Sequence, residues 1–243
     1  MKKLVALSLL LFVLLPGLIA VPVVFAAENA NGDADVQEYV FELTVNQDAG
    51  RSGNSAGQGA VLQVIPPGDN SMSNPDYKLL PFHWFKTANY YVNPANPAGL
   101  AVVDTVKASA ITWDVKTSST VFSYVTTTSR VAGSYDGFNV VSWGSYSSAN
   151  AIAVTFLWAR GKRVLETDTV MNIAFTWSLS AESGKMDVQN IMTHEFGHWC
   201  GLNDLYSNTD YYLTMYGIAG YGETWKQTLG LGDILGLQAV YGP

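Results

Sequence analysis

HEFGHWCGLND, residues 194–204, is the stretch of this 243-residue sequence that decides its fold. His194 and His198 stand four positions apart, so on a helix both imidazoles project from one face and can bind one metal ion. Gly201 can end the helix with a positive φ and turn the chain back. The Asp204 carboxylate follows three residues later as a third ligand. Zinc accepts these ligand types and in catalytic sites keeps a fourth position open, so the stretch predicts a single zinc ion bound by His194, His198 and Asp204.

Glu195 follows the first histidine directly and is placed to take a proton from a zinc-bound water. This arrangement predicts hydrolysis of an amide bond, with Glu195 as the general base. His83 is the one remaining histidine, and its aromatic neighbours indicate a packing role. Cys200 is the only cysteine, which excludes an intramolecular disulfide. It lies about 200° around the helix from His198, so we expect a buried packing thiol.

The N-terminus has the pattern of an exported protein. Two lysines precede an apolar run over residues 4–15, and small residues follow around Ala26, as is typical of a secretory signal peptide over residues 1–26. We therefore expect a secreted, extracellular protein. The alternative is an uncleaved segment that anchors the chain in a membrane.

Composition limits the range of partners. The chain has 13 basic and 20 acidic residues, a net charge of −7. Removal of residues 1–26 takes away two lysines and no acids, so the mature chain would carry 11 − 20 = −9. This acidic balance argues against nucleic acid as a partner.

The segments predict an α+β fold, with helices and strands in separate runs. Residues 27–76 read as an N-terminal extension or pro-segment, with a Gly/Ser-rich loop at 50–59, and residues 77–243 as the catalytic domain. Helices are expected at 98–116, 187–200 and 232–241, with Asp187 as an N-cap. Strands are expected at 36–46, 60–65, 89–93, 121–127, 139–143, 152–158 and 167–175.

The 194–204 stretch resembles the extended zinc motif of the metzincin peptidases, in the snapalysin-type variant with Asp as the third ligand. LTMYG at 213–217 is similar to their Met-turn. The ending from 229 to 242 resembles the C-terminal helix of matrixins, and ETDTVMN at 166–172 looks like the strand that precedes the active-site helix in prokaryotic matrixin-like proteins. The resemblance implies a twisted sheet of about five strands with an active-site helix, a Met-turn and a C-terminal helix. It also implies a monomeric zinc metalloendopeptidase that hydrolyses polypeptides.

The resemblance has departures. Matrixins usually present a third histidine where this chain has Asp204, and their pro-segment cysteine switch is absent. Calcium cannot be carried over residue by residue, and residues 136–137 read as an ordinary turn. Strand order in the family implies that residues 152–158 form the sheet edge that pairs with a substrate. Tyr216 and Tyr221 are expected either to line the pocket or to bond the tetrahedral intermediate.

Two other function classes stay open at the level of sequence. One is a zinc-dependent amidase that acts on small or cell-wall peptides. The other is a non-catalytic surface protein, which the intact Glu195 argues against. A latent zymogen, with residues 28–76 over the cleft, is a variant of the peptidase hypothesis.

Overall fold

The computed structural model describes residues 23–25, 35–46 and 68–243. Most of the expected signal peptide, the Gly/Ser-rich residues 50–59 and the expected strand at 60–65 lie outside the described residues. Within them no helix is both long and apolar enough to cross a membrane.

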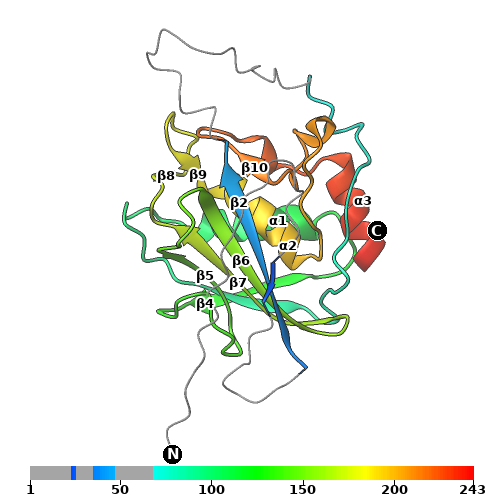
Figure 1. The fold of residues 1–243 in the computed structure, drawn as a ribbon, viewed down its shortest axis with the longest axis horizontal. Coiled ribbons are helices and arrows are strands. Elements are labelled where there is room, and N and C mark those ends of the chain that lie inside the picture. The colour runs from blue at the N-terminus through cyan, green and yellow to red at the C-terminus, as the bar shows by residue number, and fades with distance from the viewer. Residues whose placement is uncertain (1–22, 26–34, 47–67) are drawn as a thin grey trace, which may run out of the picture.

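A mixed β-sheet forms the centre of the molecule (Figure 1). Its strands follow the order β1-β2-β6-β7-β5-β3-β4, and β10 also pairs with β2. Pairing is parallel from β4 to β7 and antiparallel from β7 to β1, while β10 runs parallel to β2. The bounds are β1 Val23–Phe25, β2 Gln37–Val45, β3 Ala88–Val92, β4 Phe122–Thr127, β5 Asn139–Gly144, β6 Ala151–Arg160, β7 Arg163–Asn172 and β10 Ile218–Ala219.

Three α-helices occur among the described residues: α1 Val103–Asp114, α2 Val188–Trp199 and α3 Leu231–Tyr241. Helix α2 packs against α1 and β6, and α3 lies near the C-terminus (Figure 1). Short elements complete the fold, namely the pair β8 (Trp177–Ser178) and β9 (Met186–Asp187) and the 3-10 helices η1 (Asn208–Asp210) and η2 (Trp225–Gln227).

The expected mixture of helices and strands is confirmed, and the sheet is larger than the five strands expected. Two predicted boundaries are wrong for local reasons. Helix α1 begins at Val103 instead of residue 98, because Gly99 has a φ of +64° and the Asn96 side chain bonds the backbone of Leu100. Strand β7 ends at Asn172, whose carboxamide accepts the Ala174 N–H and turns the chain.

Residues 152–158 are not a sheet edge in the described structure. They belong to β6, which lies between β7 and β2. Strand β2 comes from the segment expected to be an extension or pro-segment, and its place in the main sheet was not predicted from the sequence. Cleavage after Ala26 would remove β1 and leave β2 on the outside of β6.

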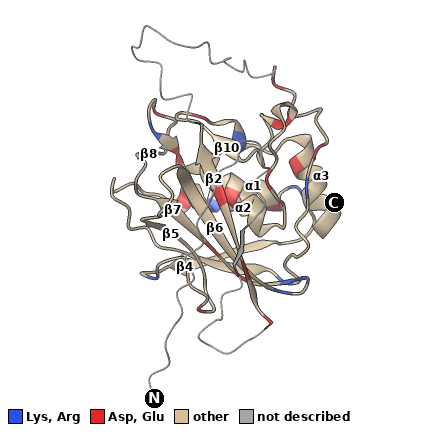
Figure 2. Ribbon diagram, viewed as in Figure 1, with Lys and Arg blue, Asp and Glu red and all other residues tan. Residues whose placement is uncertain are grey.

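Figure 2 shows how the charged residues are distributed over the described ribbon. Lys and Arg are spread over separate parts of the described ribbon and do not gather on one side (Figure 2). Several carboxylates are buried, including Glu166, Asp168, Glu195 and Asp233. Buried acids require specific partners, because an isolated charge in a protein interior is costly.

Candidate metal centre

Helix α2 presents the two histidines on one face, as the spacing predicts. It begins at the N-cap Asp187, whose side chain accepts the Asn190 N–H at 2.9 Å. His194 and His198 are fully buried. Gly201 ends the helix with a φ of +90°, and a Cβ there would lie 3.0 Å from the Phe82 carbonyl oxygen.

The chain that leaves Gly201 returns Asp204 to the helix. Its Oδ1 lies 3.2 Å from His194 Nε2 and 3.5 Å from His198 Nε2. The three ligand atoms lie within 4.8 Å of one another, so this group can hold a metal ion. All three atoms are buried and have no hydrogen-bond partner among the described residues. Unpaired buried polar atoms are costly, and a cation placed between them would satisfy all three at once.

Backbone carbonyls set the tautomer of each imidazole. His194 Nδ1 lies 2.7 Å from the Thr214 carbonyl oxygen, and His198 Nδ1 lies 3.0 Å from that of Leu202. Because a carbonyl oxygen only accepts, Nδ1 carries the proton and Nε2 keeps a free lone pair. Burial also lowers the pKa of His198 to about 4, so its ring stays neutral at physiological pH. Burial would lower the pKa of His194 as well, but Asp204 and Glu195 beside it raise it. For this ring, the carbonyl contact at Nδ1 is therefore what leaves Nε2 free to bind a metal.

Asp204 is held in its charged form. Burial alone would raise its pKa, but the adjacent side chains of His198 and His194 outweigh burial and lower it. A Tyr206 side-chain hydrogen bond lowers the pKa further. The sequence did not single out Tyr206 as a partner of this ligand.

Glu195 lies beside the cluster at the end of a chain of hydrogen bonds. Thr155 Oγ1, on β6, donates to Glu195 Oε2 at 2.6 Å. Thr169 Oγ1 lies 2.7 Å from Thr155 Oγ1 and receives the Trp199 indole N–H at 3.0 Å. Because Thr155 uses its proton on the carboxylate, Thr169 must donate to Thr155, so every donor points toward Glu195. The other carboxylate oxygen, Oε1, has no partner among the described residues, and burial raises the Glu195 pKa to about 7.

The turn at residues 213–217 packs against the helix that carries the two histidines. Met215 is 1% exposed, and a Cβ on Gly197 would lie 2.1 Å from its sulfur atom. The glycine therefore lets the turn approach the middle of α2. Asp233, in the first turn of α3, accepts the N–H groups of Thr214 and Met215 at 2.8 and 3.1 Å. This carboxylate ties the last helix to the turn.

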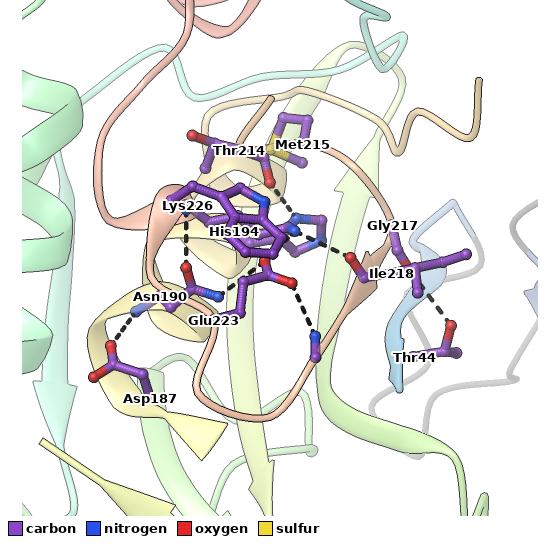
Figure 3. A network of polar contacts seen from close by, with 12 residues as sticks. Thr44, Asp187, Asn190, His194, Thr214, Met215, Gly217, Ile218, Glu223 and Lys226 are labelled. Atoms are coloured by element: carbon purple, nitrogen blue, oxygen red, sulfur yellow. Dashed lines mark hydrogen bonds and ion pairs between the residues drawn. The ribbon is translucent and has the colours of Figure 1, made fainter. Parts of the chain in front are cut away.

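A second buried network joins α2 to β10 (Figure 3). Asn190 accepts the Lys226 N–H at 2.8 Å and donates to Glu223 at 3.2 Å. Lys226, fully buried, pairs with the Glu223 carboxylate and donates to the Ile218 carbonyl oxygen at 3.0 Å. The network fixes β10 relative to the helix that carries the histidines. The sequence did not reveal it, because nothing in the local pattern distinguishes Lys226 from a surface lysine.

Other residues singled out by sequence lie outside the cluster. His83 stacks on Phe85 with ring centroids 4.4 Å apart, and Cys200 is a buried free thiol, so both expectations are confirmed. Tyr216 is buried and packs on Tyr211, while Tyr221 is 41% exposed near Phe175. Neither tyrosine belongs to the group of residues that could hold a metal, and the role of both stays a prediction.

The turn at residues 136–137 is confirmed. Asp136 Oδ1 accepts the Phe138 N–H, and Gly137 has a φ of +87°. The nearby Glu166 accepts the N–H groups of Asp136 and Gly137, and Asp168 accepts those of Gly133 and Val140. These carboxylates hold the loop between β4 and β5, and burial raises the pKa of each to about 7.

Two comparisons with known proteins gave no match. No protein-family profile matches the chain, and no curated protein is detectably similar to it. The function must therefore be argued from the site.

Proposed function

We propose that this chain is a secreted, metzincin-like zinc metalloendopeptidase that hydrolyses peptide bonds in extended polypeptides. The observation that carries the proposal is the set of four unpaired buried atoms: Nε2 of His194 and His198, Oδ1 of Asp204 and Oε1 of Glu195. Three are ligand atoms around one point, and the fourth belongs to an adjacent carboxylate.

The donor set favours zinc. Two imidazole nitrogens and one carboxylate oxygen are common zinc ligands, and three protein ligands leave room for a water or a substrate. Magnesium and calcium prefer oxygen ligands. When bound, zinc would act as a Lewis acid toward the scissile carbonyl and the attacking water.

Glu195 supplies the proton chemistry. Its raised pKa places the carboxyl group near the range in which it can both accept and donate a proton at neutral pH. In this proposal the carboxylate removes a proton from the attacking water and then delivers it to the nitrogen of the leaving amine. Thr155 holds Oε2, so the unpaired Oε1 is the oxygen that exchanges the proton.

A structural metal site would have no use for such a base. In structural zinc sites the metal is closed off by four protein ligands. Here the described residues bring three ligand side chains together and hold an unpaired carboxylate oxygen close by. This arrangement supports the enzyme over the non-catalytic alternative.

The direct test combines metal content with hydrolysis of an unfolded protein. We expect one zinc per chain by elemental analysis. We expect hydrolysis either by the intact chain or, if the chain is a latent zymogen, after proteolytic removal of residues 28–76. Chelation should abolish hydrolysis and added zinc should restore it. Glu195→Gln should keep the zinc and lose hydrolysis. The proposal is wrong if zinc-loaded protein hydrolyses nothing, whether intact or cut. It is also wrong if Glu195→Gln keeps full activity.

A further inference from the structure

Strand β2 lies between β6 and β10, in a position that we call the slot. One edge of β2 runs antiparallel along β6, from the pair Gln37–Ala159 to the pair Thr44–Ala151. The opposite edge pairs in parallel with β10 at Thr44 and Val45. Figure 3 shows Thr44 facing Gly217, beside Ile218. The end of β2 is thus held from both sides.

Backbone groups make the contacts at the end of β2. Val45 N–H donates to the Asn150 carbonyl oxygen at 2.9 Å, and Asn46 N–H donates to that of Ala219 at 2.9 Å. Hydrogen bonds of this kind do not depend on side chains. They are the means by which a sheet edge binds an extended peptide of any sequence.

Strand β2 also contacts one of the proposed metal ligands. The Phe41 ring stacks on the His198 ring, with centroids 4.5 Å apart and planes 20° from parallel. In the ladder Phe41 stands opposite Thr155, the residue that bonds Glu195. Leu43, two positions on, is completely buried in the core cluster that contains α2. The strand therefore lies over His198 and beside the residue that bonds Glu195.

A cavity of about 200 Å³ continues the slot past the end of β2. Asn46 and the β10 residues line it together with the aromatic residues Tyr211, Tyr221 and Trp225. A longer peptide on the same path could place a further apolar side chain there.

We propose that residues 37–45 occupy the place of the polypeptide substrate and keep the chain latent until this strand is released. This inference rests on the proposed function. It assigns β6 and β10 as the two walls that bind a substrate strand, antiparallel and parallel respectively. It also assigns the space around Leu43 as a pocket for a bulky apolar side chain. A cut between Asn46 and Gly68 would sever β2 from the catalytic residues.

Release follows from loss of the covalent link. While β2 is tethered, its effective concentration at the slot is high, and after a cut it binds as a separate segment that dilution can remove. We therefore insert a site for a sequence-specific protease within residues 50–59 of the full chain and compare cut and uncut protein. Hydrolysis of an unfolded protein should rise about 100-fold on cutting. Excess synthetic peptide VQEYVFELTVN, residues 36–46, should reverse the gain.

A binding measurement separates this inference from catalysis. In the Glu195→Gln chain, a fluorescent copy of the 36–46 peptide should bind cut protein and not uncut protein, as read by anisotropy. A peptide with Leu43→Asp should bind at least tenfold more weakly, because it places a charge in the buried pocket. A peptide with Val40→Ala, on the other face of the strand, should compete as well as the original.

Each outcome decides one claim. If the cut chain shows neither a gain in hydrolysis nor peptide binding, β2 is a permanent strand and the inference is wrong. Loss of the cooperative melting transition on cutting would also overturn it. If the peptide binds the cut chain but neither cut nor uncut chain hydrolyses a protein, strand binding between β6 and β10 is confirmed and the peptidase proposal is wrong. If the uncut chain hydrolyses as fast as the cut chain, the peptidase stands and latency is wrong.

Discussion

Thr155 Oγ1 donates a hydrogen bond to Glu195 Oε2 at 2.6 Å, from a strand 40 residues earlier in the sequence. The bond orients the carboxylate and lowers its pKa, against the burial that raises it. Thr155 is therefore a positioning residue for the base.

Thr155→Val removes this bond while it keeps the side-chain shape. A hydrogen bond to a charged group contributes about 1.5–3 kcal/mol, so we expect kcat of the cut chain to fall at least about tenfold. KM and zinc content should change little, since the Thr155 side chain bonds Glu195 and Thr169 and none of the three proposed zinc ligands. Thr155→Ser restores the donor and should recover most of kcat. A loss shared equally by the valine and serine variants would point to packing instead.

Replacing a proposed ligand should remove the metal. Asp204→Ala and His198→Ala should each lower bound zinc from one per chain to well below one, as measured by elemental analysis. The zinc-dependent rise in melting temperature should disappear with it, because a ligand stabilises only the state that binds it. His83→Ala is the matched control, because this histidine stacks on Phe85 outside the cluster. Loss of zinc in the control but not in the two variants would contradict the assignment.

Gly197 and Met215 should behave as a coupled pair. A Cβ at position 197 would meet the Met215 sulfur at 2.1 Å and the Trp113 ring at 2.9 Å. Overpacking of this kind costs about 1–3 kcal/mol, so Gly197→Ala should lower the free energy of unfolding by that amount. In the Gly197→Ala/Met215→Ala double variant part of this cost should be recovered, giving non-additive changes in urea denaturation. Gly68→Ala, with no neighbour within 4 Å, should have little effect.

The buried acids predict a pH-dependent stability. Burial raises the pKa of Glu166 and Asp168 to about 7, whereas unfolded carboxyls titrate near pH 4. Between about pH 4 and pH 7 the folded state therefore binds more protons than the unfolded state. The contribution of these two groups to the free energy of unfolding is fully present below pH 4 and falls as the pH rises through 7. The loss is roughly 1.4 kcal/mol for each unit by which the folded pKa exceeds the unfolded pKa.

Urea denaturation in chelator at pH 5 and pH 7.5 measures this difference. Glu166→Gln should reduce the loss of stability across the window, because the glutamine does not titrate. Asp104→Asn changes an exposed acid and should leave the difference as it is. An unchanged pH dependence in Glu166→Gln would show that this carboxyl is not responsible.

The sequence by itself determined the parts of the site that depend on local spacing. Two histidines at i and i+4 share a helix face wherever that helix lies, and Glu195 follows from its position next to one of them. Asp187 and Gly201 mark the ends of α2 because capping and positive φ are local requirements. The helix–strand mixture was predictable for the same reason.

The tertiary structure decided what surrounds these residues. The Thr155–Thr169–Trp199 chain joins β6, β7 and α2, and the Lys226 network joins η2 to α2, so no local pattern encodes either. The place of β2 depends on which strand pairs with β6, a choice made by packing between segments more than 100 residues apart. Spacing along one helix and the turn at Gly201 predicted the candidate ligands and the base, whereas long-range pairing placed Phe41 over His198 and Leu43 in the core.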